Sequence, residues 1–222
     1  IKFITVSNFT RKNMINNFSV DPRKIIVIWN QIMDLQIIKK IPLQKIDLKS
    51  ESYILIISTL VIRKNILLIQ KLANIYEKKI KFVCPYPKNI SEKRKLNKLI
   101  KNNVCIFHNL DDENLKALYL NASCVLIPSL YEGLSLIPLE SINLSKPIIM
   151  SNIEPHLHWR LPKKFYFDIN NFDDILKKLN FYLNKGNSFV DYSTFKDFKD
   201  TFSSAIEERK QGLKLIYNTQ DY

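Results

Sequence analysis

The stretch PSLYEGLSLIPLE, residues 128–140, decides how this chain can be interpreted. The apolar run at residues 124–127 predicts a buried strand, which leads into a turn and then into a short helix. Glu132 lies on the predicted turn and Glu140 on the predicted helix, with seven residues between them. Gly133, one of only three glycines in the chain, directly follows Glu132. The stretch therefore predicts a strand–turn–helix junction that carries two carboxylates.

Such a junction presents free backbone N–H groups, and the N-terminus of a helix favours an anion. Carboxylates beside it suit a ligand that also carries hydroxyl groups. A nucleotide sugar has both kinds of group, so the junction indicates a site for one. The alternative is an exposed pair of glutamates beside a tight turn, which their spacing alone does not exclude.

The rest of the chain alternates between strand and helix patterns. We expect strands at residues 1–7, 24–28, 53–57, 81–84, 104–108, 147–150 and 165–167, besides the strand at 124–127. Apolar residues at helical spacing (Leu68, Ile69, Leu72, Ile75 and Tyr76) predict one helix between them, and further helices are expected at 10–18, from 91, after 111 or 112, and from 195. Repeated βα units predict an α/β fold, a Rossmann-like doubly wound parallel sheet. Ligands of such sheets bind at the carboxyl ends of the strands.

The loop after residues 53–57 also ends a predicted buried strand, and it carries two cations, Arg63 and Lys64. Positive charge is unfavourable at the start of a helix, so a bound anion would explain it. The alternative is that both cations lie in solvent at the start of an ordinary helix.

The motif at 128–133 and 138–140, followed by SKPII at 145–149 and SN at 151–152, resembles the nucleotide-binding half of retaining GT-B glycosyltransferases of family four. The resemblance implies that Glu132 faces the donor hexose and that Glu140 binds the ribose hydroxyls. It also implies that the backbone of Gly133, Leu134 and Ser135 faces the diphosphate.

The loop at 58–65 is similar to the phosphate loop of that family, Gly-Arg/Thr-Leu-x-x-x-Lys-Gly/Asn. Lys64 falls on the lysine that pairs with the donor diphosphate, whereas Ser58 replaces the usual glycine and Thr59 the frequent arginine. Arg63 is a candidate to compensate. His108 lies where the family chain passes the nucleotide base, and a structural histidine is the alternative there.

The resemblance implies a cytoplasmic enzyme that transfers a hexose with retention to a glycan or lipid-linked acceptor, with Glu132 and Lys64 as catalytic residues. No metal or other cofactor is expected, because lysine and a helix N-terminus would stabilise the leaving diphosphate. A non-catalytic nucleotide-sugar-binding member, or a partner subunit, is the alternative function. Contact with the inner face of the cell membrane is a further expectation.

Four regions are predicted. Residues 1–30 would end the acceptor domain and enter the hinge, 31–50 would be a linker, 51–190 would bind the nucleotide sugar, and 191–222 would form helices that pack back toward the acceptor domain. The chain does not begin with methionine, so we expect a fragment whose acceptor domain lies elsewhere.

Composition adds few constraints. The net charge of +13 would suit nucleic acid, but the basic stretch from residue 91 lacks the interleaved aromatic residues of such sites and is interpreted as a solvated helix face. No apolar run reaches membrane-spanning length, and no signal-peptide pattern is present. Cys84, Cys105 and Cys124 are expected as buried free thiols in a reducing compartment.

Overall fold

The computed structural model describes residues 2–30, 52–77 and 79–217. The predicted linker at 31–50 lies outside the described residues. The helices and strands run in the order β1 (Phe3–Thr5), α1 (Asn8–Phe18), η1 (Pro22–Lys24), β2 (Ile25–Val27), β3 (Ile54–Ile57), η2 (Ile62–Lys64), α2 (Ile66–Ala73), β4 (Ile80–Cys84), α3 (Ile90–Lys101), β5 (Cys105–His108), α4 (Asp112–Asn121), β6 (Cys124–Ile127), α5 (Ile137–Asn143), β7 (Ile148–Ser151), α6 (Glu154–Leu157), η3 (Lys163–Phe165), β8 (Tyr166–Phe167), α7 (Phe172–Lys185), η4 (Tyr192–Thr194) and α8 (Lys196–Tyr217).

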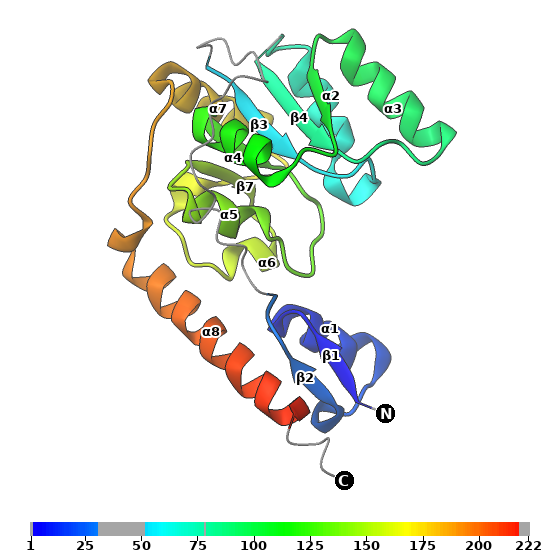
Figure 1. Ribbon diagram of the computed structural model, residues 1–222, viewed down its shortest axis with the longest axis vertical. Coiled ribbons are helices and arrows are strands. Elements are labelled where there is room, and N and C mark those ends of the chain that lie inside the picture. The colour runs from blue at the N-terminus through cyan, green and yellow to red at the C-terminus, as the bar shows by residue number, and fades with distance from the viewer. Residues whose placement is uncertain (1, 31–51, 78, 218–222) are drawn as a thin grey trace.

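A six-stranded parallel sheet in the order β5-β4-β3-β6-β7-β8 forms the larger part of the molecule (Figure 1). The strand order reverses direction between β3 and β6, so the loops that follow these two strands meet at the switch point. The predicted doubly wound α/β fold is therefore confirmed. Both the cation loop and the Glu132 turn follow strands at this switch point.

The central strands are buried on both faces, as their continuous apolar runs predict. Ile54 and Ile56 of β3 belong to a core cluster with α2, α3 and α7, while Leu55 packs in a second cluster with α4 and α5. Successive side chains of a strand point to opposite faces, so β3 supplies both cores.

Side-chain caps set the starts of several helices. The carboxylate of Asp111 accepts a hydrogen bond from the N–H of Asn114, which settles the cap of α4 in favour of residue 111. Asn89 caps α3 and Asn171 caps α7 in the same way.

A second, two-stranded parallel sheet pairs β1 with β2, and α8 crosses from the larger sheet to lie against β2 (Figure 1). A Cβ atom added to Gly212 of α8 would lie only 2.5 Å from the carbonyl oxygen of Val27. Trp29 donates its indole N–H to Glu208 of the same helix at 2.8 Å. The assignment of these regions to an acceptor domain and a hinge stays a prediction.

Two local expectations were wrong. Cys105 is exposed, because β5 is an edge strand. Ile75 is exposed, because α2 ends at Ala73 and does not carry its apolar face that far. The region from residue 195 forms a single helix, α8.

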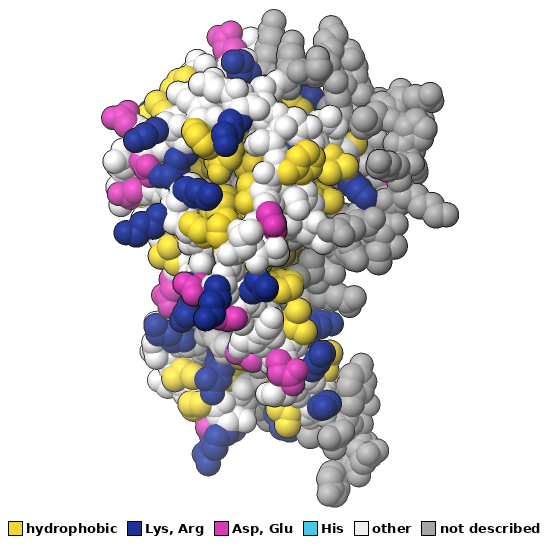
Figure 2. Space-filling model, turned by 90° about the vertical axis from the view of Figure 1, so that its left-hand side faces the viewer, with side chains coloured by type: hydrophobic (Ala, Val, Ile, Leu, Met, Phe, Trp, Pro, Cys, Tyr) yellow, Lys and Arg dark blue, Asp and Glu magenta, His cyan; other side chains and the backbone are white. Residues whose placement is uncertain are grey.

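The surface is mixed in charge and polarity. Figure 2 shows one face on which Lys and Arg side chains stand among Asp, Glu and apolar ones. None of the described helices is both long and apolar enough to span a membrane.

Candidate functional site

A cavity of about 440 Å³ lies at the carboxyl ends of β3, β4 and β5. Its wall includes backbone and side chains from three loops and from the start of α5. The lining residues are Ile57, Ser58, Thr59, Arg63, Lys64, Val83, Cys84, Pro85, Asn109, Leu110 and Ile137. Three of the predicted donor-binding residues, Thr59, Arg63 and Lys64, therefore share one cavity.

Local backbone geometry presents the two cations. Arg63 and Lys64 lie on the short 3-10 helix η2, and Asn65 then adopts a left-handed conformation with φ of 56°. The Asn65 side chain caps α2 by accepting a hydrogen bond from the N–H of Leu68. Asparagine tolerates this conformation better than most residues do. The turn separates the cations from α2, so they do not oppose its dipole from within its first turn.

The two cations meet Glu132, which comes from the loop after β6. Lys64 Nζ forms a hydrogen-bonded ion pair with Glu132 Oε1, and Arg63 Nη1 lies 3.1 Å from Oε2. The hydroxyl of Ser129 also donates to Oε1 at 2.7 Å. The side chains of Glu132 and Lys64 are 5% and 13% exposed, whereas that of Arg63 is 50% exposed. The sequence-predicted residues Glu132, Lys64 and Arg63 thus form one cluster.

Opposing effects act on the ionisation of Glu132. Burial alone would raise its pKa, but the hydrogen bonds from Lys64 and Ser129 and the charges of Lys64 and Arg63 outweigh burial. The pKa of Glu132 is consequently lowered below its ordinary value, and its carboxylate is ionised at neutral pH.

Glu140, on α5, has a different environment. Its Oε2 accepts a hydrogen bond from the hydroxyl of Tyr119 at 2.5 Å. Burial raises the pKa of Glu140, and the Tyr119 hydrogen bond opposes that rise only in part. Burial likewise raises the pKa of Tyr119 well above its ordinary value, so the phenol stays a donor.

The turn between the two glutamates contacts the start of α1. The Ser7 hydroxyl donates to the carbonyl oxygen of Gly133 at 2.6 Å, and a Cβ atom on Gly133 would lie 3.2 Å from Thr10 Oγ1. Ser135 is buried, and its hydroxyl has no hydrogen-bond partner among the described residues. Leu134 is half-buried beside it. Glycine at 133 therefore permits the close approach of α1, and Ser135 keeps an unused donor.

The His108 ring is held in place by contacts with neighbouring residues. Its Nδ1 lies 3.0 Å from the carbonyl oxygen of Cys84, and its ring stacks on Tyr86 with centroids 4.5 Å apart. Asn109, rather than His108, is among the residues that line the cavity. These contacts fit the structural alternative for His108.

The described residues contain no group of three or more His, Cys, Asp or Glu side chains placed to hold a metal ion. Neither His156 nor His158 belongs to such a group. His158 stacks on Trp29, with ring centroids 5.1 Å apart. His156 is buried, its Nδ1 lies 2.9 Å from the carbonyl oxygen of Ser151, and burial lowers its pKa to about 4.

Sequence reasoning missed Ser129 and Tyr119, the hydroxyl partners of the two glutamates. Ser129 stands inside the quoted motif, so its spacing of three residues from Glu132 was a usable signal. Tyr119 falls within the helix expected after residue 111 or 112, and no pattern linked it to Glu140.

Comparison with known proteins identifies the fold. A search among curated proteins gave no match. A glycosyltransferase structure from Rickettsia africae ESF-5 is 18% identical with a TM-score of 0.72, over 99% of this chain and 64% of that one. A mutant of S. aureus TarM in complex with UDP and other ligands is 20% identical with a TM-score of 0.63, over 100% and 44%. A trehalose-6-phosphate structure from E. coli bound with UDP-2-fluoro glucose is 10% identical with a TM-score of 0.67, over 99% and 60%.

At these identities the structural likeness shows the fold alone, and the chain spans less than two thirds of each of these proteins. The family assignment comes from the sequence. The model of the family described as Glycosyl transferases group 1 matches residues 40–194, which is more than half of the chain. The chain therefore belongs to the group 1 glycosyl transferases, within the GT-B fold.

Proposed function

We propose that the chain is the donor-binding half of a hexosyltransferase, which moves a sugar from a nucleotide sugar to an acceptor hydroxyl with retention of configuration. The observation that carries the proposal is the cluster of Lys64, Arg63 and Glu132 beside the 440 Å³ cavity. The acceptor would be a glycan or a lipid-linked sugar, as in cell-surface polysaccharide synthesis.

The cluster suits a ligand that carries a diphosphate and a sugar. Arg63 is half exposed and can meet phosphate oxygens directly, whereas Lys64 lies deeper against Glu132. A diphosphate would attract both cations, and the oxygens of Glu132 would then be free to accept hydrogen bonds from hexose hydroxyls. Cations placed where the leaving diphosphate gains charge would lower the barrier to transfer.

Two further features support the donor site. The unused hydroxyl of buried Ser135 offers a donor that the described residues leave unpaired, and such groups usually find a partner. UDP and a UDP sugar occupy two of the similar structures, TarM and the E. coli protein. We propose Glu140 as the ribose contact, which would share its carboxylate with Tyr119.

We propose that no metal or other cofactor takes part, because Lys64 and Arg63 supply the positive charge that a metal ion supplies elsewhere. We also propose a cytoplasmic location. The three cysteines are free thiols, as is usual for a reducing compartment.

Donor binding can be tested by titration calorimetry with a panel of nucleoside diphosphates. For the tightest ligand, Lys64→Ala should weaken binding by about tenfold or more, because a charge-assisted contact to phosphate is lost. The corresponding nucleoside should bind the variant and the parent chain alike. Lys196→Ala removes an exposed cation on α8 and is the matched control. Equal losses for nucleoside and diphosphate would remove Lys64 from the phosphate site.

A second test concerns turnover. We expect the 222 residues alone to bind donor without transferring sugar, because the acceptor wall would come from outside the chain. Orientation of two reactants can supply about 7–11 kcal/mol of a barrier, and that part would be forfeited. A radiolabel transfer assay with a cell-extract acceptor pool measures it. Robust turnover would contradict the two-walled mechanism.

A non-catalytic, donor-binding role is the second candidate. It is favoured by Thr59, which stands exposed in the cavity where a further cation would be expected. In this case the longest available form of the protein would bind the diphosphate with the same Lys64 dependence and still show no transfer.

A further inference from the structure

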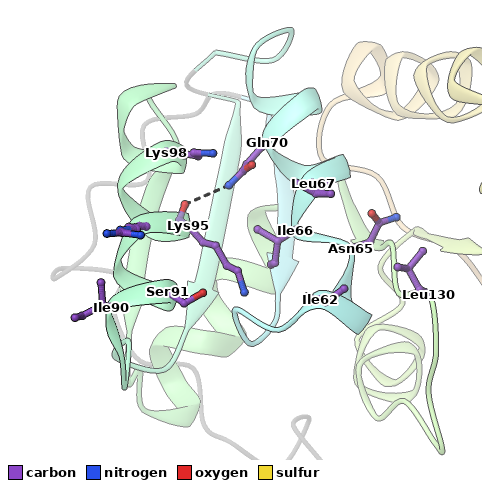
Figure 3. A pocket seen from close by; sticks show the side chains of 11 residues that line it. Ile62, Asn65, Ile66, Leu67, Gln70, Ile90, Ser91, Lys95, Lys98 and Leu130 are labelled. Carbon is purple, nitrogen blue, oxygen red and sulfur yellow. Dashed lines mark hydrogen bonds between the residues drawn. The ribbon is translucent and has the colours of Figure 1, made fainter.

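A second and larger cavity, a groove of about 560 Å³, lies between α2 and α3 (Figure 3). Its apolar side chains include Ile62 on η2, Leu67 on α2 and Ile90 at the start of α3. These three are 77%, 77% and 70% exposed, and Leu130, at the end of the groove beside η2, is 44% exposed. A cluster of large apolar side chains that are this exposed is typical of an interaction surface.

Cations line the groove on its α3 side. Arg94, Lys95 and Lys98 are among its lining residues, and no acidic residue of the described part of the chain is. Lys95 is held in place by its hydrogen bond to the carbonyl oxygen of Leu60 at 3.0 Å. Arg94 and Lys98 are exposed, and neither forms an ion pair with a described residue. The face in Figure 2, in contrast, mixes cations with acidic side chains.

The groove is next to the candidate donor cavity. Ile62 lines the groove, whereas Arg63 and Lys64 of the same 3-10 helix line the donor cavity. The N–H of Leu130 donates to the carbonyl oxygen of Arg63 at 2.8 Å, which fixes the end of the groove to the same element. A partner docked in the groove would therefore be separated from the donor cavity only by the short helix η2.

We propose that this groove docks the chain on the surface of an anionic phospholipid bilayer. The exposed apolar side chains would enter the boundary between headgroups and acyl chains, and Arg94 and Lys98 would meet lipid phosphates. Exposed apolar tips beside unpaired cations are the combination that interfacial binding uses. At low ionic strength the net charge of +13 adds a long-range attraction to the same surface, which salt screens. The proposal is independent of whether the neighbouring cavity binds a nucleotide sugar.

Co-sedimentation with vesicles tests the proposal at 0.15 M salt. The chain should bind vesicles of phosphatidylglycerol and phosphatidylcholine and leave pure phosphatidylcholine vesicles largely unbound. Arg94→Gln with Lys98→Gln should lower the partition coefficient about fivefold for each cation. Ile62→Gln with Leu67→Gln should lower it on the order of tenfold, because apolar insertion is lost.

The matched control removes the same charge elsewhere. Lys163→Gln with Lys196→Gln replaces exposed lysines on η3 and α8, elements that pack in the core on the opposite face of the sheet. At this salt concentration charges far from the bilayer are largely screened, so the control should bind as the parent does. Unchanged urea midpoints in all variants would show that each one is folded.

Three results would overturn the proposal. The control pair could reduce binding as much as the groove pair, which would mean that only net charge matters. The apolar pair could have no effect, which would mean that nothing enters the bilayer. An acidic peptide, polyglutamate, could bind the groove with the same Arg94 and Lys98 dependence while vesicles do not, which would assign the groove to a protein partner.

Discussion

Glu132 and Glu140 stand eight positions apart in the chain and have opposite electrostatic environments. Glu132 receives two cations and a hydroxyl, and its pKa is lowered. Glu140 accepts a hydrogen bond from a neutral donor, Tyr119, and burial raises its pKa. The two glutamates look alike in the sequence motif, so their chemistry is decided by residues from other strands and helices. The first holds positive charge in place, and the second is a partly desolvated acceptor.

Replacing Glu132 should have the largest effect on stability. Glu132→Ala would leave Lys64 nearly buried without a counter-charge, and Arg63 would lose its partner too. Removing one member of a buried ion pair typically costs about 3–5 kcal/mol, and we expect about 3 kcal/mol because Arg63 reaches solvent. Urea denaturation at pH 7 measures the loss.

The double variant Glu132→Gln with Lys64→Met is the control for that experiment. It removes both charges together and should lose much less than the single alanine variant. If the single and double variants lose the same amount, the cluster is held by packing and not by charge.

Replacing Glu140 should act on ligand binding more than on folding. Glu140→Ala is expected to weaken binding of the preferred nucleoside diphosphate by about 1–3 kcal/mol, since hydrogen bonds to an ionised group are lost. Calorimetry measures it, and Tyr119→Phe serves as the control because it keeps the carboxylate. An alanine variant with parental affinity would remove Glu140 from the donor site.

The smallest expected effects are those of the two glutamine substitutions on the free energy of unfolding, and they have opposite signs. Glu132 has a lowered pKa, so its stabilisation is present above the ordinary value of 4.5 and is lost as pH falls through the lowered pKa. Glu140 has a raised pKa, so its cost to stability sets in as pH rises above the ordinary value of 4.5 and is complete above the raised pKa. At pH 7, Glu132→Gln should lower the free energy of unfolding and Glu140→Gln should raise it, each by less than the roughly 3 kcal/mol expected for Glu132→Ala.

Urea titrations at pH 7 and pH 4 measure that contrast. At pH 4 the Glu140 difference should nearly vanish, because that carboxyl group is then close to the neutral state that glutamine imitates. The Glu132 difference should shrink less, because its lowered pKa keeps the carboxylate ionised to lower pH. Two substitutions with the same sign at pH 7 would show that the two environments are less different than these contacts indicate.

Much of the fold was predictable because its signals are local. The continuous apolar run at 53–57 indicated a strand covered on both faces, and alternation with helices indicated a parallel sheet. The position of Arg63 and Lys64 at a strand end also placed them near the Glu132 turn. The local pattern did not predict that Cys105 is exposed, because it does not show which strand lies at the edge of the sheet.

The contacts that define the site were harder to predict. Lys64 and Glu132 are 68 residues apart, and a hydrogen-bonded ion pair depends on the angle at which two loops meet. Ser129 could have been found, since it lies in the same turn. Tyr119 could not, because a buried aromatic residue at helical spacing usually indicates packing, and its hydroxyl points at a residue from another helix.

The contact of α8 with β2 has a consequence for the order in which the molecule is made. Trp29 and Glu208 are 179 residues apart, and Gly212 follows Glu208 against the backbone of Val27. A ribosome that adds about 5–20 residues each second needs roughly 10–40 s between them. Throughout that interval the nascent chain carries β2 without its covering helix, so β1 and β2 leave the ribosome well before the helix that completes their packing.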